Sequence, residues 1–110
     1  MRTLYVYILT NRSGTLYTGV TSNLGAHILA HKRGESNFTS RYKIDRLVYY
    51  EECEGPIASI TREKQVKAWT GKKRIDLINS LNPTLLDLAD DWFTPSELQS
   101  DGQSIVRAQG

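Results

Sequence analysis

The sequence predicts an α+β domain in which helices flank a small three-stranded antiparallel sheet, in the order ββαβααα. Two short runs rich in aromatic and β-branched residues, at 4–9 and 15–20, stand on either side of a turn. A third such run lies at 47–50, and helical spacing of apolar residues dominates the segments after it. Because 110 residues leave room for one core, a single domain is expected.

The first two runs are predicted to form a hairpin. Residues 11–14 have turn chemistry, since the glycine tolerates a positive φ and the asparagine can bond the local backbone. One run contains Tyr5-Val6-Tyr7, and the other contains Tyr17-Thr18-Gly19. The hairpin is therefore expected to place Tyr7 and Tyr17 on a shared face.

Residues 24–32 are predicted to be the first helix. The three residues before it offer N-cap side chains, and Gly34 ends its helical spacing. Residues 34–43 are polar, which indicates a loop between this helix and the third strand.

Further helical segments are expected at 57–69, 72–79 and 85–92. In the longest of them, Ile57, Ile60 and Ala68 form the stripe expected to face the core, and Glu63 lies at the edge of that stripe. Residues 1–93 are predicted to form the domain, and 94–110 are predicted to form a polar, disordered tail.

The composition limits where the protein works. No apolar run is long enough to span a bilayer, and no secretory signal precedes the first strand. The single Cys53 cannot form an internal disulfide and suits a reducing compartment. These features predict a cytoplasmic protein with no membrane partner.

Charge is distributed unevenly along the chain. Residues 1–74 contain thirteen of the fourteen lysines and arginines and six of the twelve acidic residues, so this part has a net charge of +7. Residues 75–110 have a net charge of −5. A basic body with an acidic end is compatible with nucleic-acid contact, although a solvated charged surface explains the charges as well.

Five stretches give the chain a specific resemblance. They are residues 4–9, 16–22, 38–42, 46–51 and 62–69. In this order they resemble the GIY-YIG nuclease superfamily, in particular its small stand-alone bacterial members, with Tyr5 in place of the first signature glycine and Thr18 in place of the isoleucine. The resemblance implies a phosphodiester hydrolase that uses one divalent metal ion, Mg²⁺ or Mn²⁺, and no organic cofactor.

The resemblance also implies a set of catalytic residues. Glu63 matches the metal-binding glutamate, and a hard carboxylate suits Mg²⁺. Tyr7 and Tyr17 match the signature tyrosines that bind or deprotonate the attacking water. The residue types also permit simpler roles, with Glu63 paired to Lys67 on a helix surface and both tyrosines packed on the sheet.

His27 occupies the position at which the family has a phosphate-binding arginine, ten residues after Tyr17. An arginine has a permanent charge and a two-pronged donor, whereas a histidine has one donor and partial charge near neutral pH. Loss of such a donor costs ~10²–10³ in rate. The departure therefore places catalysis, but not the fold, in question.

His31 lies one helical turn beyond His27. It matches a family position near the nucleophile, and an ordinary histidine pKa makes it the preferred general base. The same two histidines also permit a chelate for Zn²⁺ or another transition metal, with Glu63 as a third ligand.

Cations and aromatic residues suggest where nucleic acid binds. Residues 37–43 mix aromatic, hydroxyl and cationic side chains, which suits phosphate contact and base stacking, although a plain surface loop explains them equally. The candidate binding residues are Arg33, Arg41, Tyr42 and Lys67.

The expected function is a metal-dependent endonuclease acting on DNA, with RNA not excluded, and weakened by His27. The alternative is a catalytically impaired nucleic-acid-binding module. The nuclease hypothesis requires Tyr7, Tyr17, His27, His31 and Glu63 to converge on one concave surface. Nothing local in the sequence forces that convergence, and Glu63 on the opposite side of the sheet from Tyr17 and His31 would contradict the nuclease assignment.

Overall fold

Strand β1 (Thr3–Thr10) forms the centre of the sheet in the computed structural model, which describes residues 2–99. Strands β2 (Leu16–Thr21) and β3 (Arg46–Glu54) pair with it on either side, both antiparallel. The helices are α1 (Leu24–Lys32), α2 (Asn37–Tyr42), α3 (Pro56–Ala68), α4 (Gly71–Leu81) and α5 (Pro95–Leu98). The predicted α+β class with a three-stranded antiparallel sheet is confirmed.

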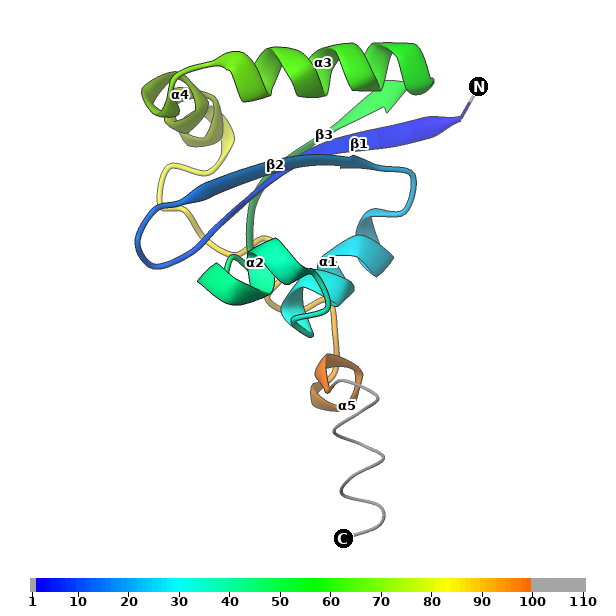
Figure 1. Cartoon of the computed structure of the whole chain (residues 1–110), viewed down its shortest axis with the longest axis vertical. Coiled ribbons are helices and arrows are strands. Elements are labelled where there is room, and N and C mark those ends of the chain that lie inside the picture. Colours follow the sequence, from blue (N-terminus) through cyan, green and yellow to red (C-terminus); the bar gives the residue numbers. More distant parts are fainter. Residues whose placement is uncertain (1, 100–110) are drawn as a thin grey trace, which may run out of the picture.

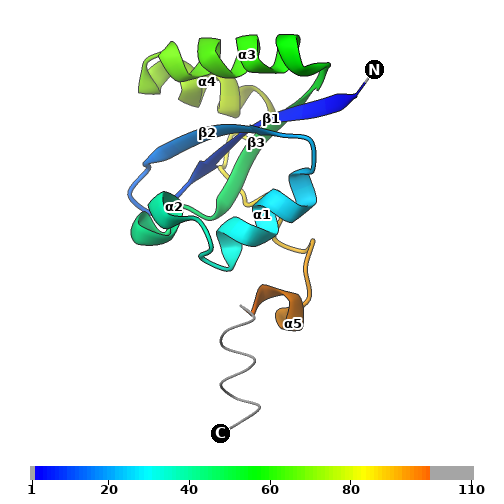
Figure 2. The ribbon, with the colours of Figure 1, turned by 45° about the vertical axis from the view of Figure 1, so that its right-hand side comes forward.

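Helices cover both faces of the sheet. Figure 1 shows α3 and α4 on one face and α1 and α2 on the other, and the turned view of Figure 2 shows the same arrangement. Because β1 is central, its side chains are buried on both faces, with Tyr7 and Leu9 in one core and Ile8 in the other. Ile28 of α1 packs in the first core, and Val66 of α3 packs in the second.

Two predicted segments differ from the structure. The segment predicted as a loop contains helix α2, whose buried Thr39 faces the interior and whose end is closed by Lys43 at a positive φ of 54°. The segment 85–92, predicted to be helical, contains no helix: Leu85 has a positive φ, and residues 88–91 form turns. The element order is therefore ββααβααα.

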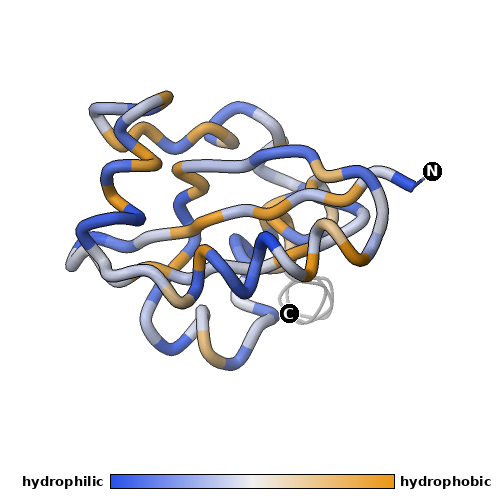
Figure 3. The backbone as a smooth tube through the Cα atoms, turned by 90° about the horizontal axis from the view of Figure 1, so that it is seen from above, coloured by the Kyte–Doolittle hydropathy of each residue, from blue (hydrophilic) through white to orange (hydrophobic). Residues whose placement is uncertain are grey.

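The inward face of α3 was also predicted incorrectly. Ile57 and Ile60 are exposed, and the buried residues of this helix are Ser59, Glu63 and Val66. Along α3, hydrophobic and hydrophilic stretches alternate, as the hydropathy colours of Figure 3 show. Ser59 and Val66 are fully buried, and Glu63 lies on the same inward side of the helix.

Helix α5 is the last element among residues 2–99, and the sequence did not predict it. Thr94 and Glu97 form a capping box at the start of α5, each satisfying a backbone N–H of the other. The rest of the predicted tail, 100–110, lies outside the described residues. Within residues 2–99, every helix is too short or too polar to cross a membrane.

Candidate active site

The two signature tyrosines share a face of the hairpin, as predicted. Tyr7 pairs with Gly19 and Leu9 pairs with Tyr17, so the two tyrosines are diagonal neighbours, two residue pairs apart, on the face covered by α1. Their ring centroids are 6.4 Å apart. Tyr7 is buried and Tyr17 is half-buried, so Tyr17 is the more accessible phenol.

Gly19 makes room for the Tyr7 ring. A Cβ atom at Gly19 would lie 2.6 Å from the hydroxyl oxygen of Tyr7 and 2.7 Å from Cζ, closer than real Cβ contacts. The glycine of the Tyr17-Thr18-Gly19 run is therefore required by a cross-strand contact, because the phenol ring of Tyr7 passes over it.

Replacing Gly19 with alanine is expected to lower the free energy of unfolding by about 1–3 kcal/mol, because the buried Tyr7 ring must move. Urea denaturation of wild type and variant measures the change. Gly25→Ala is the control, since a Cβ there meets only the Asn23 amide oxygen at 3.9 Å. Equal stability of Gly19→Ala and wild type would contradict the packing argument.

Helix α1 directs both histidines toward the tyrosines. Its N-cap is Asn23, one of the predicted capping residues, whose side chain accepts a hydrogen bond from the N–H of Ala26. From this helix His27 and His31 reach within 6.3 and 5.9 Å of the Tyr7 ring, measured between centroids.

Two threonines that the sequence analysis did not identify hold these histidines. Thr21 Oγ1 lies 2.8 Å from Nδ1 of the exposed His27 and also accepts the N–H of Asn23. Thr39 Oγ1 of α2 lies 2.7 Å from Nδ1 of the buried His31. The position of Thr21, two residues after Gly19 of the Tyr17-Thr18-Gly19 run, could have indicated its role from the sequence. The contact of Thr39 with His31 could be found only from the tertiary structure.

His31 lies in a buried hydrogen-bonded line with Tyr7 and Thr39. Its Nε2 is 3.2 Å from the Tyr7 hydroxyl, so both ring nitrogens have partners. Burial, followed by the effect of His27, lowers the pKa of His31 to about 4. Burial and the nearby Tyr17 raise the pKa of Tyr7 well above its ordinary value. The expectation that His31 is a base with an ordinary pKa is therefore wrong, because the neutral ring is held inside the protein.

The low pKa of His31 predicts a loss of stability in acid. Above pH 6.5 the histidine is neutral in both the folded and unfolded states, so it adds no pH dependence. As the pH falls from 6.5 toward 4, the unfolded chain binds a proton that the folded state does not, and stability falls by up to about 3 kcal/mol. Urea denaturation at several pH values measures this slope. His31→Gln should reduce the slope, and an unchanged slope would contradict the assignment.

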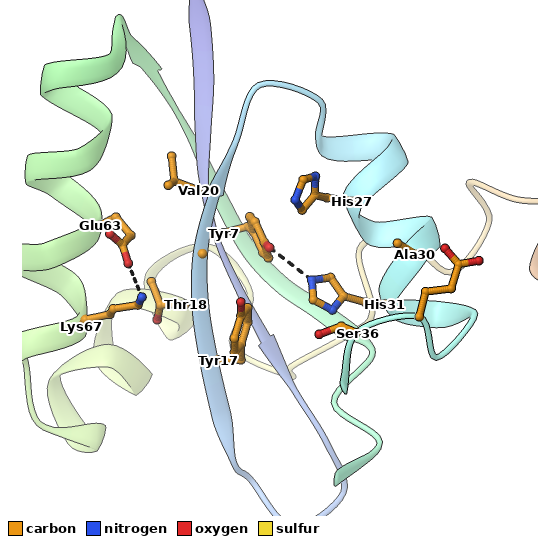
Figure 4. A pocket seen from close by; sticks show the side chains of 12 residues that line it. Tyr7, Tyr17, Thr18, Val20, His27, Ala30, His31, Ser36, Glu63 and Lys67 are labelled. Atoms are coloured by element: carbon orange, nitrogen blue, oxygen red, sulfur yellow. Dashed lines mark hydrogen bonds and ion pairs between the residues drawn. The ribbon is translucent and has the colours of Figure 1, made fainter. Parts of the chain in front are cut away.

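Glu63 and Lys67 reach the same pocket from the other side of the edge strand. A pocket of about 400 Å³ is lined by Tyr7, Tyr17, His27, His31, Glu63 and Lys67, together with Thr18, Gly19 and Val20 of β2. Figure 4 shows β2 running between the tyrosine–histidine group and the Glu63–Lys67 pair. The five predicted catalytic residues therefore line one pocket. Glu63, however, comes from the opposite face of the sheet and meets the others across the edge strand, so the expectation that it lies on the same side as Tyr17 and His31 is wrong.

The Glu63 carboxylate is buried and forms an ion pair with the exposed Lys67 one turn along α3. The simpler role considered for Glu63 was an ion pair with Lys67 on the helix surface. The ion pair is present, but Glu63 is buried. Beside it, the Thr18 hydroxyl is buried without a hydrogen-bond partner among the described residues. One carboxylate with an unpartnered hydroxyl in the same pocket fits a hard divalent ion, which needs few protein ligands.

A transition-metal chelate does not fit the site. No group of three or more His, Cys, Asp and Glu side chains within residues 2–99 is arranged to hold a metal ion. The His27 and His31 centroids are 6.4 Å apart, and hydrogen bonds occupy both nitrogens of His31. The alternative of a zinc site made by His27, His31 and Glu63 is therefore wrong.

The predicted nucleic-acid-binding residues are scattered. Lys67 lines the pocket, but Arg33 does not, since it donates to the Glu97 carbonyl at 2.6 Å and lies 3.7 Å from Glu35. Arg41 and Tyr42 are exposed on α2, outside this pocket. Neither arginine replaces the charge that the family has at the position of His27.

Comparison with known proteins gives consistent matches. The model of the family described as "GIY-YIG catalytic domain" matches residues 3–76. Three similar curated proteins, each named UPF0213 protein, come from Staphylococcus aureus strains Mu3, Mu50 and N315. Each is 33% identical over 75 residues, covering 67% of this chain and 92% of the relative. No solved structure matches the chain.

Proposed function

The chain belongs to the GIY-YIG catalytic domain family, a nuclease-type domain, and from this premise we propose that it is an endonuclease that needs Mg²⁺ or Mn²⁺. The proposed substrate is DNA, with RNA as the second possible substrate. We place the reaction in the cytoplasm and expect it to need no organic cofactor.

One observation carries the proposal: a single pocket gathers two phenols, two imidazoles and a buried carboxylate around the edge strand. Packing, together with the ion pair between Glu63 and Lys67, accounts for each residue separately. It does not require that all five side chains line one pocket. A pocket that combines a buried acid with titratable side chains is a candidate catalytic site.

Each residue has a proposed role that follows from its surroundings. The buried line of Tyr7, His31 and Thr39 holds the Tyr7 ring in place and excludes water from that side. The accessible Tyr17 positions the attacking water with its hydroxyl. His27 donates to the scissile phosphate from the exposed side of α1, and Lys67 neutralises phosphate charge.

Glu63 would hold the divalent ion, with the unpartnered Thr18 hydroxyl as an additional oxygen in the same pocket. When bound, such an ion polarises the phosphoryl oxygen and stabilises the leaving oxygen. The ion pair between Glu63 and Lys67 would weaken metal binding, because the Lys67 ammonium occupies the same carboxylate.

Purified protein is expected to nick supercoiled plasmid DNA only when Mg²⁺ or Mn²⁺ is added, because its own side chains lack a Lewis acid. Gel electrophoresis of the plasmid, with and without EDTA, measures the conversion. Nicking that persists in EDTA would indicate a contaminant or a different site and would contradict the proposal.

A second candidate function is a nucleic-acid-binding module with impaired catalysis. It is favoured by the shortage of phosphate-binding charge in the pocket. Among the described residues that line the pocket, Lys67 is the only lysine or arginine, whereas Glu35 and Glu63 are acidic. Such a module would bind DNA without cutting it, and its affinity would fall steeply with salt as counterions are released. Salt-independent binding, or none, would remove this candidate.

A further inference from the structure

An aromatic row leads away from the pocket along α2. Tyr17 lines the pocket, its ring centroid is 6.1 Å from that of Phe38, and Phe38 is 5.2 Å from Tyr42. Phe38 and Tyr42 are four residues apart on the helix and are 51% and 49% exposed. Two large aromatic rings in contact and half in solvent are a surface on which flat apolar groups can stack.

A cationic pocket lies at the far end of this row. It has a volume of about 370 Å³, and Tyr42 lines it together with Arg12, Lys43 and Arg46. Asp45 is the one acidic residue in its lining, and none of the three cations forms an ion pair with another described residue. Uncompensated cations beside exposed aromatic rings complement a polyanion with flat bases.

The hairpin turn and α2 are joined so that the two parts form one surface. Asn11 Nδ2 donates to the Tyr42 carbonyl at 2.8 Å, and its Oδ1 accepts the N–H of Thr15. The positive φ of Lys43 ends α2 directly beside this bond. The turn that carries Arg12 is thereby held against the end of the aromatic row.

We propose that the row of Tyr17, Phe38 and Tyr42 and the cationic pocket beyond it bind an unpaired nucleic-acid strand next to the scissile phosphate. The inference rests on the proposed function and names the substrate class, which is nucleic acid with a single-stranded segment at the cleavage point. Bases stack on Phe38 and Tyr42, and the backbone contacts Arg12, Lys43 and Arg46.

The exposure of the rings favours an unpaired strand over a duplex. Phe38 and Tyr42 are about half exposed, so their ring faces can stack on bases whose own faces are free. Bases inside a duplex are also stacked on each other, so their faces are not available to side chains. An extended single strand has free faces and a backbone able to follow the row.

The experiment measures binding in EDTA, which separates it from cleavage. Fluorescein-labelled dT12, U12 and a 12-base-pair duplex are titrated with wild type, Phe38→Leu and Tyr42→Leu, followed by anisotropy. Each leucine variant keeps an apolar side chain but loses the ring. Affinity for the single strands is expected to fall by about 10-fold, with the duplex changed less than about twofold. Comparing dT12 with U12 shows whether the strand is DNA or RNA.

Control variants make the outcome specific. Phe38→Trp keeps a stacking ring and should retain wild-type affinity, and Trp92→Leu removes an aromatic residue of 37% exposure outside the row. Thermal unfolding checks that each variant is folded. Unchanged single-strand affinity in the leucine variants, or an equal loss on the duplex, overturns the inference alone. Failure of wild type to bind any of the three ligands overturns the proposed function as well.

Discussion

Glu63→Gln is expected to reduce metal-dependent nicking by ~10³-fold or more, because the substitution removes the carboxylate that would hold the ion. Glutamine has nearly the same shape, so the buried site keeps its packing, and Lys67, which is exposed, loses an ion pair of small energetic value. Plasmid nicking over a range of Mg²⁺ and Mn²⁺ concentrations measures the loss.

The matched control is Glu54→Gln, which removes an exposed carboxylate at the end of β3, outside the pocket. It should nick at the wild-type rate. If Glu63→Gln retained the wild-type rate while remaining folded, the metal assignment would be wrong. If both variants lost activity equally, the effect would come from net charge and not from the site.

His27→Arg is expected to raise the rate of metal-dependent cleavage by ~10²-fold, because it supplies a charged donor where the exposed face of α1 borders the pocket. The substitution removes the contact between His27 and Thr21, whose hydroxyl still accepts the N–H of Asn23. Single-turnover nicking at saturating protein separates the rate of cleavage from affinity.

Ala26→Arg is the control for the gain, since it adds the same charge at an exposed neighbouring position that does not line the pocket. A gain confined to His27→Arg would show that the natural protein is limited at this position. An equal gain from Ala26→Arg would reflect general attraction of DNA. No gain from either variant would contradict the view that position 27 contacts the scissile phosphate.

The hairpin and the tyrosine pair were predictable because they depend on local rules. Strand pairing across a short turn fixes which residues share a face, so Tyr7 and Tyr17 could be placed from sequence spacing. The i,i+4 spacing likewise placed His27 and His31 on one side of α1. In both cases the relevant interactions connect residues close together in the chain.

Helices α2 and α3 show where local rules fail. Helix α2 has polar residues in a segment with no clear apolar period, and it is held by contacts such as Thr39 with His31, eight residues earlier. On α3 the apolar stripe of Ile57 and Ile60 faces solvent, whereas the face with Ser59 and Val66 packs inward. Tertiary packing outweighed the hydrophobic pattern there.

The sequence by itself determined the family, the α+β class and the residue types of the site, because the motifs and the spacing of the strands depend on residues close together in the chain. Tertiary structure alone decided three things about that site. It brought Glu63 to the tyrosines around the edge of β2, lowered the pKa of His31 by burial, and held Arg33 against Glu97 and away from the pocket. Each depends on which elements pack together, and no local spacing specifies that packing.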